Sequence, residues 1–92
     1  MVEKFALAAF RSRQQVMHMV SALNRMGVHA GIVTTPRAIA VGCGLSVRFD
    51  PADARIAAEA VRSQQPGSLI GFYLVTRDAQ GHMTVERLGT QF

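Results

Sequence analysis

The sequence has only one cysteine, few acidic residues and no long apolar segment. A single cysteine excludes an internal disulfide framework and a Cys-x-x-Cys metal or redox motif. No segment approaches the roughly 18 apolar residues of a membrane-spanning helix. The apolar residues 5–10 lack the basic segment and cleavage site of a signal peptide. We therefore expect a cytoplasmic protein in which the thiol of Cys43 stays reduced.

The shortage of acidic residues gives the chain a net charge of +4, from ten basic and six acidic residues. Nine of the basic residues are arginines, and they are scattered from Arg11 to Arg87. A nucleic-acid-binding protein concentrates such residues on one face or stripe. We therefore interpret most of them as solvated surface and do not expect nucleic-acid binding. The weaker alternative is a preference for anionic ligands or acidic partners.

The length of 92 residues fits a single domain spanning residues 1–92. The apolar fraction of 49% is too high for a disordered chain. A domain of this size buries a small core and is marginally stable alone. Self-association would stabilise it, although the sequence neither shows nor excludes a homo-oligomer.

In the N-terminal part, apolar spacing predicts a buried strand over residues 4–10, then a helix. Ser12 and Gln15 have the spacing of a capping box, in which each side chain bonds the backbone amide of the other residue. Gly27 is placed to end the helix in a left-handed conformation. Residues 28–33 form the next predicted strand. The apolar stripe of the helix comprises Val16, Met19, Val20, Leu23 and Met26.

Residues 37–44 are predicted to be a loop, with a helical turn at 38–41. The alternation over residues 45–49 predicts a half-buried strand. Asp50 and Pro51 are then suited to the N-cap and first position of a second helix, which the proline and glycine at 66–67 end. The apolar stripe of this helix comprises Ile56, Ala57, Ala60 and Val61.

The C-terminal part gives the strongest strand signal, over residues 69–76. A turn at 78–81 and a strand at 82–88 complete a predicted hairpin. The element order is β-α-β-β-α-β with an additional strand. The predicted fold class is therefore α+β, a ferredoxin-like sandwich with an antiparallel sheet and both helices on one face. This fold hosts many functions and decides none of them.

Cys43 is the strongest candidate for a functional residue. It lies between Gly42 and Gly44, whose small size lets the backbone pass close to the sulfur and aim amides at it as an anion nest. Arg37 precedes it in the same loop, and a guanidinium favours the reactive thiolate. The alternative is that Cys43 is a small buried residue without reactivity.

Three sequence segments resemble the family called putative selenium/sulfur carrier protein-like. They are Thr-Pro-Arg-Ala-Ile at 35–39, Gly-Cys-Gly-Leu at 42–45 and Val-Arg-Phe at 47–49. The resemblance extends from the first strand to the end of the second helix. It implies that Cys43 is the carrier thiol and that Arg37 is its partner. The residues expected to shape the loop are Thr35, Pro36, Gly42 and Gly44.

The first functional hypothesis is that Cys43 holds a persulfide or selenopersulfide for transfer between enzymes, acting stoichiometrically rather than by turnover. The resemblance implies a cysteine desulfurase or selenocysteine lyase and an acceptor protein as partners. No cofactor is expected, and the three histidines lack metal-ligand spacing. The alternative is a non-catalytic oligomerising or partner-binding module, in which residues 78–92 serve self-association or a partner.

A third hypothesis, RNA binding, depends on exposed aromatic rings on the open face of the sheet. It gains support only if at least two of the predicted strand aromatics face that side. These residues are Phe5, Phe10, Phe49, Phe72 and Tyr73.

Overall fold

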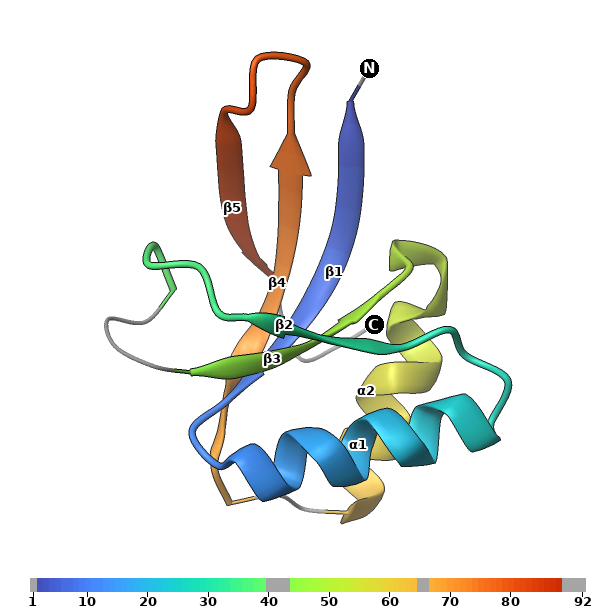
Figure 1. Ribbon diagram of the computed structural model, residues 1–92. Helices are drawn as coiled ribbons and strands as arrows, with labels where there is room; N and C mark the ends of the chain where they lie inside the picture. Colours follow the sequence, from blue (N-terminus) through green and yellow to red (C-terminus); the bar gives the residue numbers. More distant parts are fainter. Residues whose placement is uncertain (1, 40–43, 65–66, 89–92) are drawn as a thin grey trace.

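Five strands, two α-helices and one 3-10 turn form the described part of the chain. Figure 1 shows this computed structural model, which describes residues 2–39, 44–64 and 67–88. The elements are β1 (Glu3–Phe10), α1 (Arg13–Arg25), β2 (Gly31–Thr34), β3 (Leu45–Phe49), the 3-10 turn η1 (Pro51–Asp53), α2 (Ala54–Gln64), β4 (Leu69–Arg77) and β5 (Met83–Leu88).

The strands form one antiparallel sheet in the order β2-β3-β1-β4-β5. Strand β1 is central, between β3 and β4, and both helices cover one face of the sheet (Figure 1). This arrangement confirms the predicted α+β, ferredoxin-like architecture. The predicted terminal hairpin is also confirmed, because β5 pairs with β4 along its whole length.

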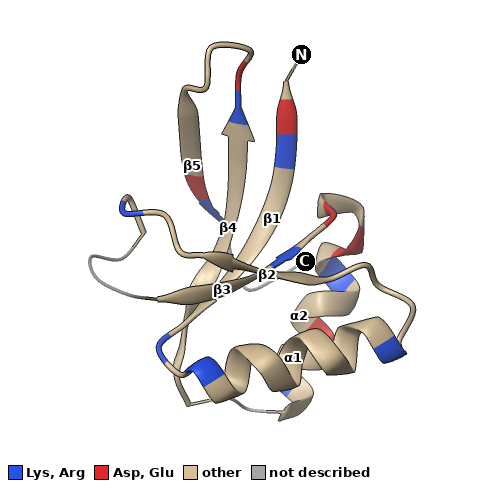
Figure 2. Ribbon diagram, in the orientation of Figure 1, with Lys and Arg blue, Asp and Glu red and all other residues tan. Residues whose placement is uncertain are grey.

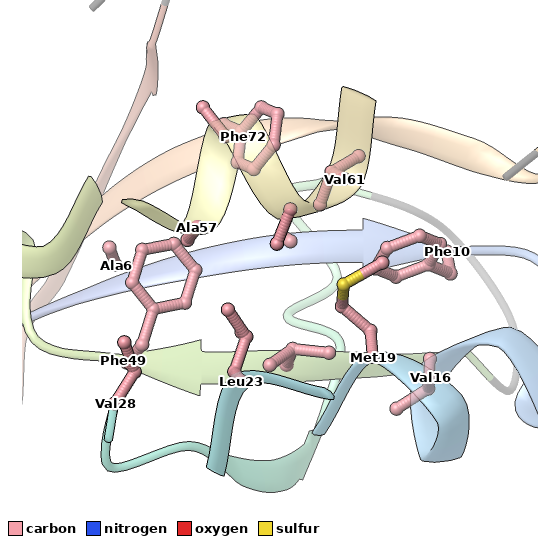
Figure 3. Close-up of a cluster of buried hydrophobic side chains, with 14 residues drawn as sticks. Ala6, Phe10, Val16, Met19, Leu23, Val28, Phe49, Ala57, Val61 and Phe72 are labelled. Carbon is pink, nitrogen blue, oxygen red and sulfur yellow. The ribbon is translucent and has the colours of Figure 1, made fainter. Parts of the chain in front are cut away.

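The main core lies between the helices and the sheet. Because successive strand residues point to opposite faces, Ala6, Ala8 and Phe10 of β1 all face the helices. Figure 3 shows Met19 of α1 beside the Phe10 ring and Phe49 of β3 opposite Ala57 of α2. The small alanines allow the helix backbones to approach the sheet closely.

The opposite face of the sheet is buried as well, although no helix of the described chain covers it. Phe5, Leu7 and Ala9 of β1 form a second apolar cluster with Tyr73 and Val75 of β4. Partly buried side chains from other elements pack against it, namely Val33, Ile39, Ile70 and Val85. We call this surface the second face. Strand β1 is consequently buried on both sides.

The capping of α1 differs in one detail from the predicted capping box. The Ser12 hydroxyl accepts from the Gln15 amide at 3.3 Å, as predicted. The Gln15 side chain, however, does not reach back to Ser12. Its Oε1 atom accepts hydrogen bonds from the backbone amide and hydroxyl of Ser68, and the Ser12 amide donates to that hydroxyl. Ser68 lies 53 residues further along the chain, so local spacing could not predict this contact.

The turn after α1 confirms the role of Gly27, whose φ of +88° lies in the left-handed region. Strand β2 is shorter than predicted and begins at Gly31, because the preceding residues are bonded to α1 instead of to the sheet. The Val28 amide donates to the Leu23 carbonyl, and the Ala30 amide donates to the side chain of Asn24.

The start of the second helical region is as predicted, with Asp50 accepting from the Ala52 amide at 2.8 Å. The apolar stripe of α2 is rotated from the predicted one. Ile56 is 41% exposed, whereas Ala58 is buried with Ala57. The sheet thus contacts the alanine side of α2, and Ile56 faces away from the core.

The described residues contain no helix that is long and apolar enough to cross a membrane.

Packing at the centre of the main core predicts a large effect for Leu23→Ala. Leu23 is fully buried, so its truncation should lower the free energy of unfolding by about 2–5 kcal/mol. Met26→Ala is the matched control, because Met26 lies in the turn after the same helix and is 53% exposed. It should change stability by no more than about 0.5 kcal/mol. Urea denaturation measures both, and equal losses would contradict the assigned orientation of α1.

Candidate functional site

The loop between β2 and β3 is closed at its base by the backbone. The Thr35 amide donates to the Gly44 carbonyl at 2.9 Å, one step beyond the paired residues Thr34 and Leu45. The first and last residues of the loop therefore lie side by side, where β2 ends and β3 begins.

Gly44 lies at a close approach, where a side chain would crowd Thr35. A Cβ atom at this position would lie 3.1 Å from the Thr35 hydroxyl oxygen and 3.9 Å from the carbonyl oxygen of Phe10. Its φ is not in the left-handed region, so the need for glycine here comes from space and not from backbone strain. The base of the loop is therefore packed tightly between β2 and β1.

A buried pair of hydroxyl groups lies directly beneath this base. Thr35 is 4% exposed and Ser46 is fully buried, and their oxygen atoms are 2.6 Å apart. Each side chain thereby satisfies the other in an apolar surrounding, where an unpaired hydroxyl would be costly. Ser46 was not predicted as a site residue. Its position in an alternating strand indicated a polar residue facing solvent, and only the burial of the second face makes it part of the site.

The chain turns tightly after Thr35. Pro36 begins the turn, and its carbonyl accepts from the Ile39 amide at 3.0 Å. The Ile39 side chain packs against the second face, whereas Arg37 is exposed. Arg37 has no ion pair within the described ranges. The turn thus anchors the loop through Ile39 and leaves the guanidinium of Arg37 accessible.

Two of the predicted site residues, Gly42 and Cys43, lie outside the described residues, as do residues 40–41 of the predicted helical turn. The structure brings Thr35, Gly44 and Pro36 together at the base of the loop. The chemistry assigned to Cys43 and Arg37 stays a prediction.

The aromatic side chains of the described residues do not offer a stacking platform for bases. Phe5 and Tyr73 lie on the second face, but they are only 6% and 9% exposed. The guanidinium of Arg48 covers the Phe5 ring, 4.0 Å from its centre, and donates to the Glu3 carboxylate at 3.0 Å. Two of the predicted strand aromatics thus face the open side of the sheet, which meets the condition set for RNA binding, but both are too buried to stack on bases.

Other polar groups do not assemble into a second site. No three His, Cys, Asp or Glu side chains in the described part of the chain lie close enough to hold a metal ion. Two surface hollows, of about 410 and 520 Å³, lie away from the loop. The first adjoins Lys4 and Arg48 at the far end of the sheet, and the second adjoins Met17 and Arg25 on α1.

Comparison with known protein families matched residues 5–67 to one family, described as putative Se/S carrier protein-like. The match covers more than half of the chain and includes the whole loop from Thr35 to Gly44. The chain belongs to this family. Neither the curated proteins nor the solved structures gave a significant match.

The match to the Se/S carrier protein-like family does not extend over the whole chain. It includes β2, β3 and both helices, but it stops before β4 and β5. Strand β4 pairs with almost the whole of β1, so this chain completes its sheet with a segment beyond the match. Membership confirms the predicted family.

The buried hydroxyl pair predicts a specific stability difference. Thr35→Val keeps the shape of the side chain but leaves the Ser46 hydroxyl without its partner, which should cost about 1–3 kcal/mol. Thr35→Ser retains the hydroxyl and should cost less. Thr34→Val, at an exposed neighbouring position, is the control and should stay within about 0.5 kcal/mol. If Thr35→Val unfolds at the same urea concentration as wild type, the hydroxyl pair does not support the loop base.

Proposed function

We propose that this protein carries sulfur or selenium on Cys43, as a persulfide or selenopersulfide, and passes it between enzymes. The observation that carries this proposal is the family match, which extends across Cys43 and the loop around it. The proposed donor is a cysteine desulfurase or selenocysteine lyase, and the acceptor is a second protein. A cytoplasmic location belongs to the proposal, because the free thiol must stay reduced.

The base of the loop supports a carrier role mechanically. A carrier thiol has to reach the active sites of two different proteins, so it benefits from an exposed loop on a rigid base. Here the Thr35–Gly44 hydrogen bond and the Thr35–Ser46 pair hold the base, and Ile39 anchors the turn on the second face. Gly44 adds no side chain next to Cys43 that would obstruct a partner.

The proposed transfer is redox-neutral. The Cys43 thiolate attacks the terminal sulfur of a donor persulfide, a new sulfur–sulfur bond forms, and the donor's own sulfur–sulfur bond breaks. The donor cysteine leaves as a thiolate, and Cys43 becomes the persulfide. The selenium reaction is the same, with a terminal selenium atom in place of sulfur. Positive charge near Cys43, supplied in this proposal by Arg37, favours the attacking thiolate.

Intact-mass analysis tests the carrier role. The protein is incubated with a cysteine desulfurase and cysteine, and separately with a selenocysteine lyase and selenocysteine. The expected result is a mass increase of one sulfur or one selenium atom on wild type, reversed by a thiol reductant.

Cys43→Ser is the control for site and should remain unlabelled. Because Cys43 is the only cysteine, any labelling of that variant is nonspecific. An unlabelled wild-type protein with either enzyme, or equal labelling of both proteins, would overturn the proposal.

Arg37→Ala tests the proposed charge partner. Removing the guanidinium should slow alkylation of Cys43 by uncharged iodoacetamide at neutral pH, by about two- to fivefold, the range expected for one exposed charge pair. Arg25→Ala, at the far end of α1, is the matched control and should leave the rate unchanged. Equal rates in wild type and Arg37→Ala would show that Arg37 does not influence the thiol.

A further inference from the structure

Strand register collects three of the scattered arginines at one end of the sheet. Phe10 at the end of β1 pairs with Leu45, the first residue of β3, so the β2–β3 loop and the start of α1 lie at the same end. We call this the loop end. It carries Arg11 and Arg13, which follow β1, and Arg37 in the loop itself, and all three are exposed.

The carboxylates lie elsewhere. The chain has six acidic residues, and all are described. Four lie at the opposite end of the sheet, where Glu3 starts β1, Asp50 and Asp53 follow β3, and Asp78 follows β4. The remaining two are Glu59 within α2 and Glu86 within β5. Glu86 pairs with Leu74 of β4. Figure 2 shows basic segments in the β2–β3 loop and at the start of α1, and acidic segments at the far ends of β1 and β4.

The arginines of the loop end are not explained by folding. None of the ion pairs found between described residues includes Arg11, Arg13 or Arg37. Arg13 occupies the first position of α1, where the helix dipole favours an acidic side chain, and the first turn of α1 contains none. The positive end of a 13-residue helix therefore adds to the charge of three guanidinium groups that form no ion pair with any described residue.

We propose that the loop end, defined by Arg11, Arg13 and Arg37, is a docking surface for an acidic face of a partner protein. This inference rests on the proposed function, since the partner would be a protein that loads or unloads Cys43. Complementary charge steers such encounters and fixes their orientation. Docking here would bring the partner to the loop that contains Cys43.

A protein fits this surface better than a nucleic acid. Three arginines spread over the end of a sheet do not form a continuous stripe along which a phosphate backbone could run. The rings that could stack on bases, Phe5 and Tyr73, are buried on the second face. A transient protein complex needs only a modest complementary field, which is what three exposed charges supply.

The probe for this surface is fluorescently labelled poly-L-glutamate, with binding measured by anisotropy at about 0.1 M salt, where charges are screened beyond about 10 Å. The test variant combines Arg11→Glu, Arg13→Glu and Arg37→Glu. The matched control combines Lys4→Glu, Arg25→Glu and Arg55→Glu, which change the net charge by the same amount away from the loop end. Melting curves establish that both variants are folded.

Wild type should bind poly-L-glutamate at this salt concentration, and binding should be lost at about 1 M salt, where the screening length falls to about 3 Å. The test variant should bind at least about tenfold more weakly, and the control within about twofold of wild type, because surface charge acts locally. Equal weakening of both variants would overturn the proposal, since only net charge would then matter. No binding by wild type would also overturn it.

Two further arms make the result specific. A single-stranded oligonucleotide that binds wild type more tightly than poly-L-glutamate would identify a nucleic-acid surface and overturn the proposal. Cys43→Ser should bind poly-L-glutamate as wild type does, because the surface does not depend on the thiol. For the wild-type protein, peptide binding without sulfur or selenium loading would refute the carrier role, whereas loading without peptide binding would refute the docking surface.

Discussion

The burial of strand β1 on both of its faces is the constraint on which the rest of the structure depends. Every residue from Phe5 to Phe10 is at most 6% exposed, although the helices cover only one side of the sheet. The second face is covered by contributions from separate elements, including Ile39 of the β2–β3 loop and the Arg48 guanidinium over Phe5. The loop is therefore part of the core on this side. Through Ile39, the β2–β3 loop packs against the same apolar cluster as the buried strand β1.

The sequence predicts the elements whose signals are local. The apolar spacing of α1, the N-cap at Asp50, the left-handed Gly27 and the hairpin of β4 and β5 all depend on neighbouring residues. The predictions that were wrong depend on distant contacts. Gln15 bonds Ser68 because the start of β4 lies against α1, and Ile56 faces solvent because the close approach of α2 to the sheet favours alanine.

The residues of the candidate site likewise divide into those that the local sequence identifies and those that only distant contacts reveal. Thr35, Pro36 and Gly44 could be singled out from their motif, and the structure supplies the physical reason for Gly44 in its contact with the Thr35 hydroxyl. Ser46 could not be found, because alternation separates the two faces of a strand without revealing whether each meets water or protein. The location of Arg11, Arg13 and Arg37 at one end of the sheet could not be found either, since only the register of β1 against β3 brings their segments there.

The two ends of the sheet are stabilised in different ways. Stability favours an acidic first turn in α1 and paired charges, such as those that Glu3 forms with Arg48 and Arg77 at the other end of the sheet. The loop end has neither feature. The base of the β2–β3 loop is stabilised instead by uncharged contacts. These are the Thr35–Ser46 hydroxyl pair and the packing of Ile39 against the second face. These contacts are buried, whereas Arg37 is exposed, so the base of the loop is held without use of its guanidinium.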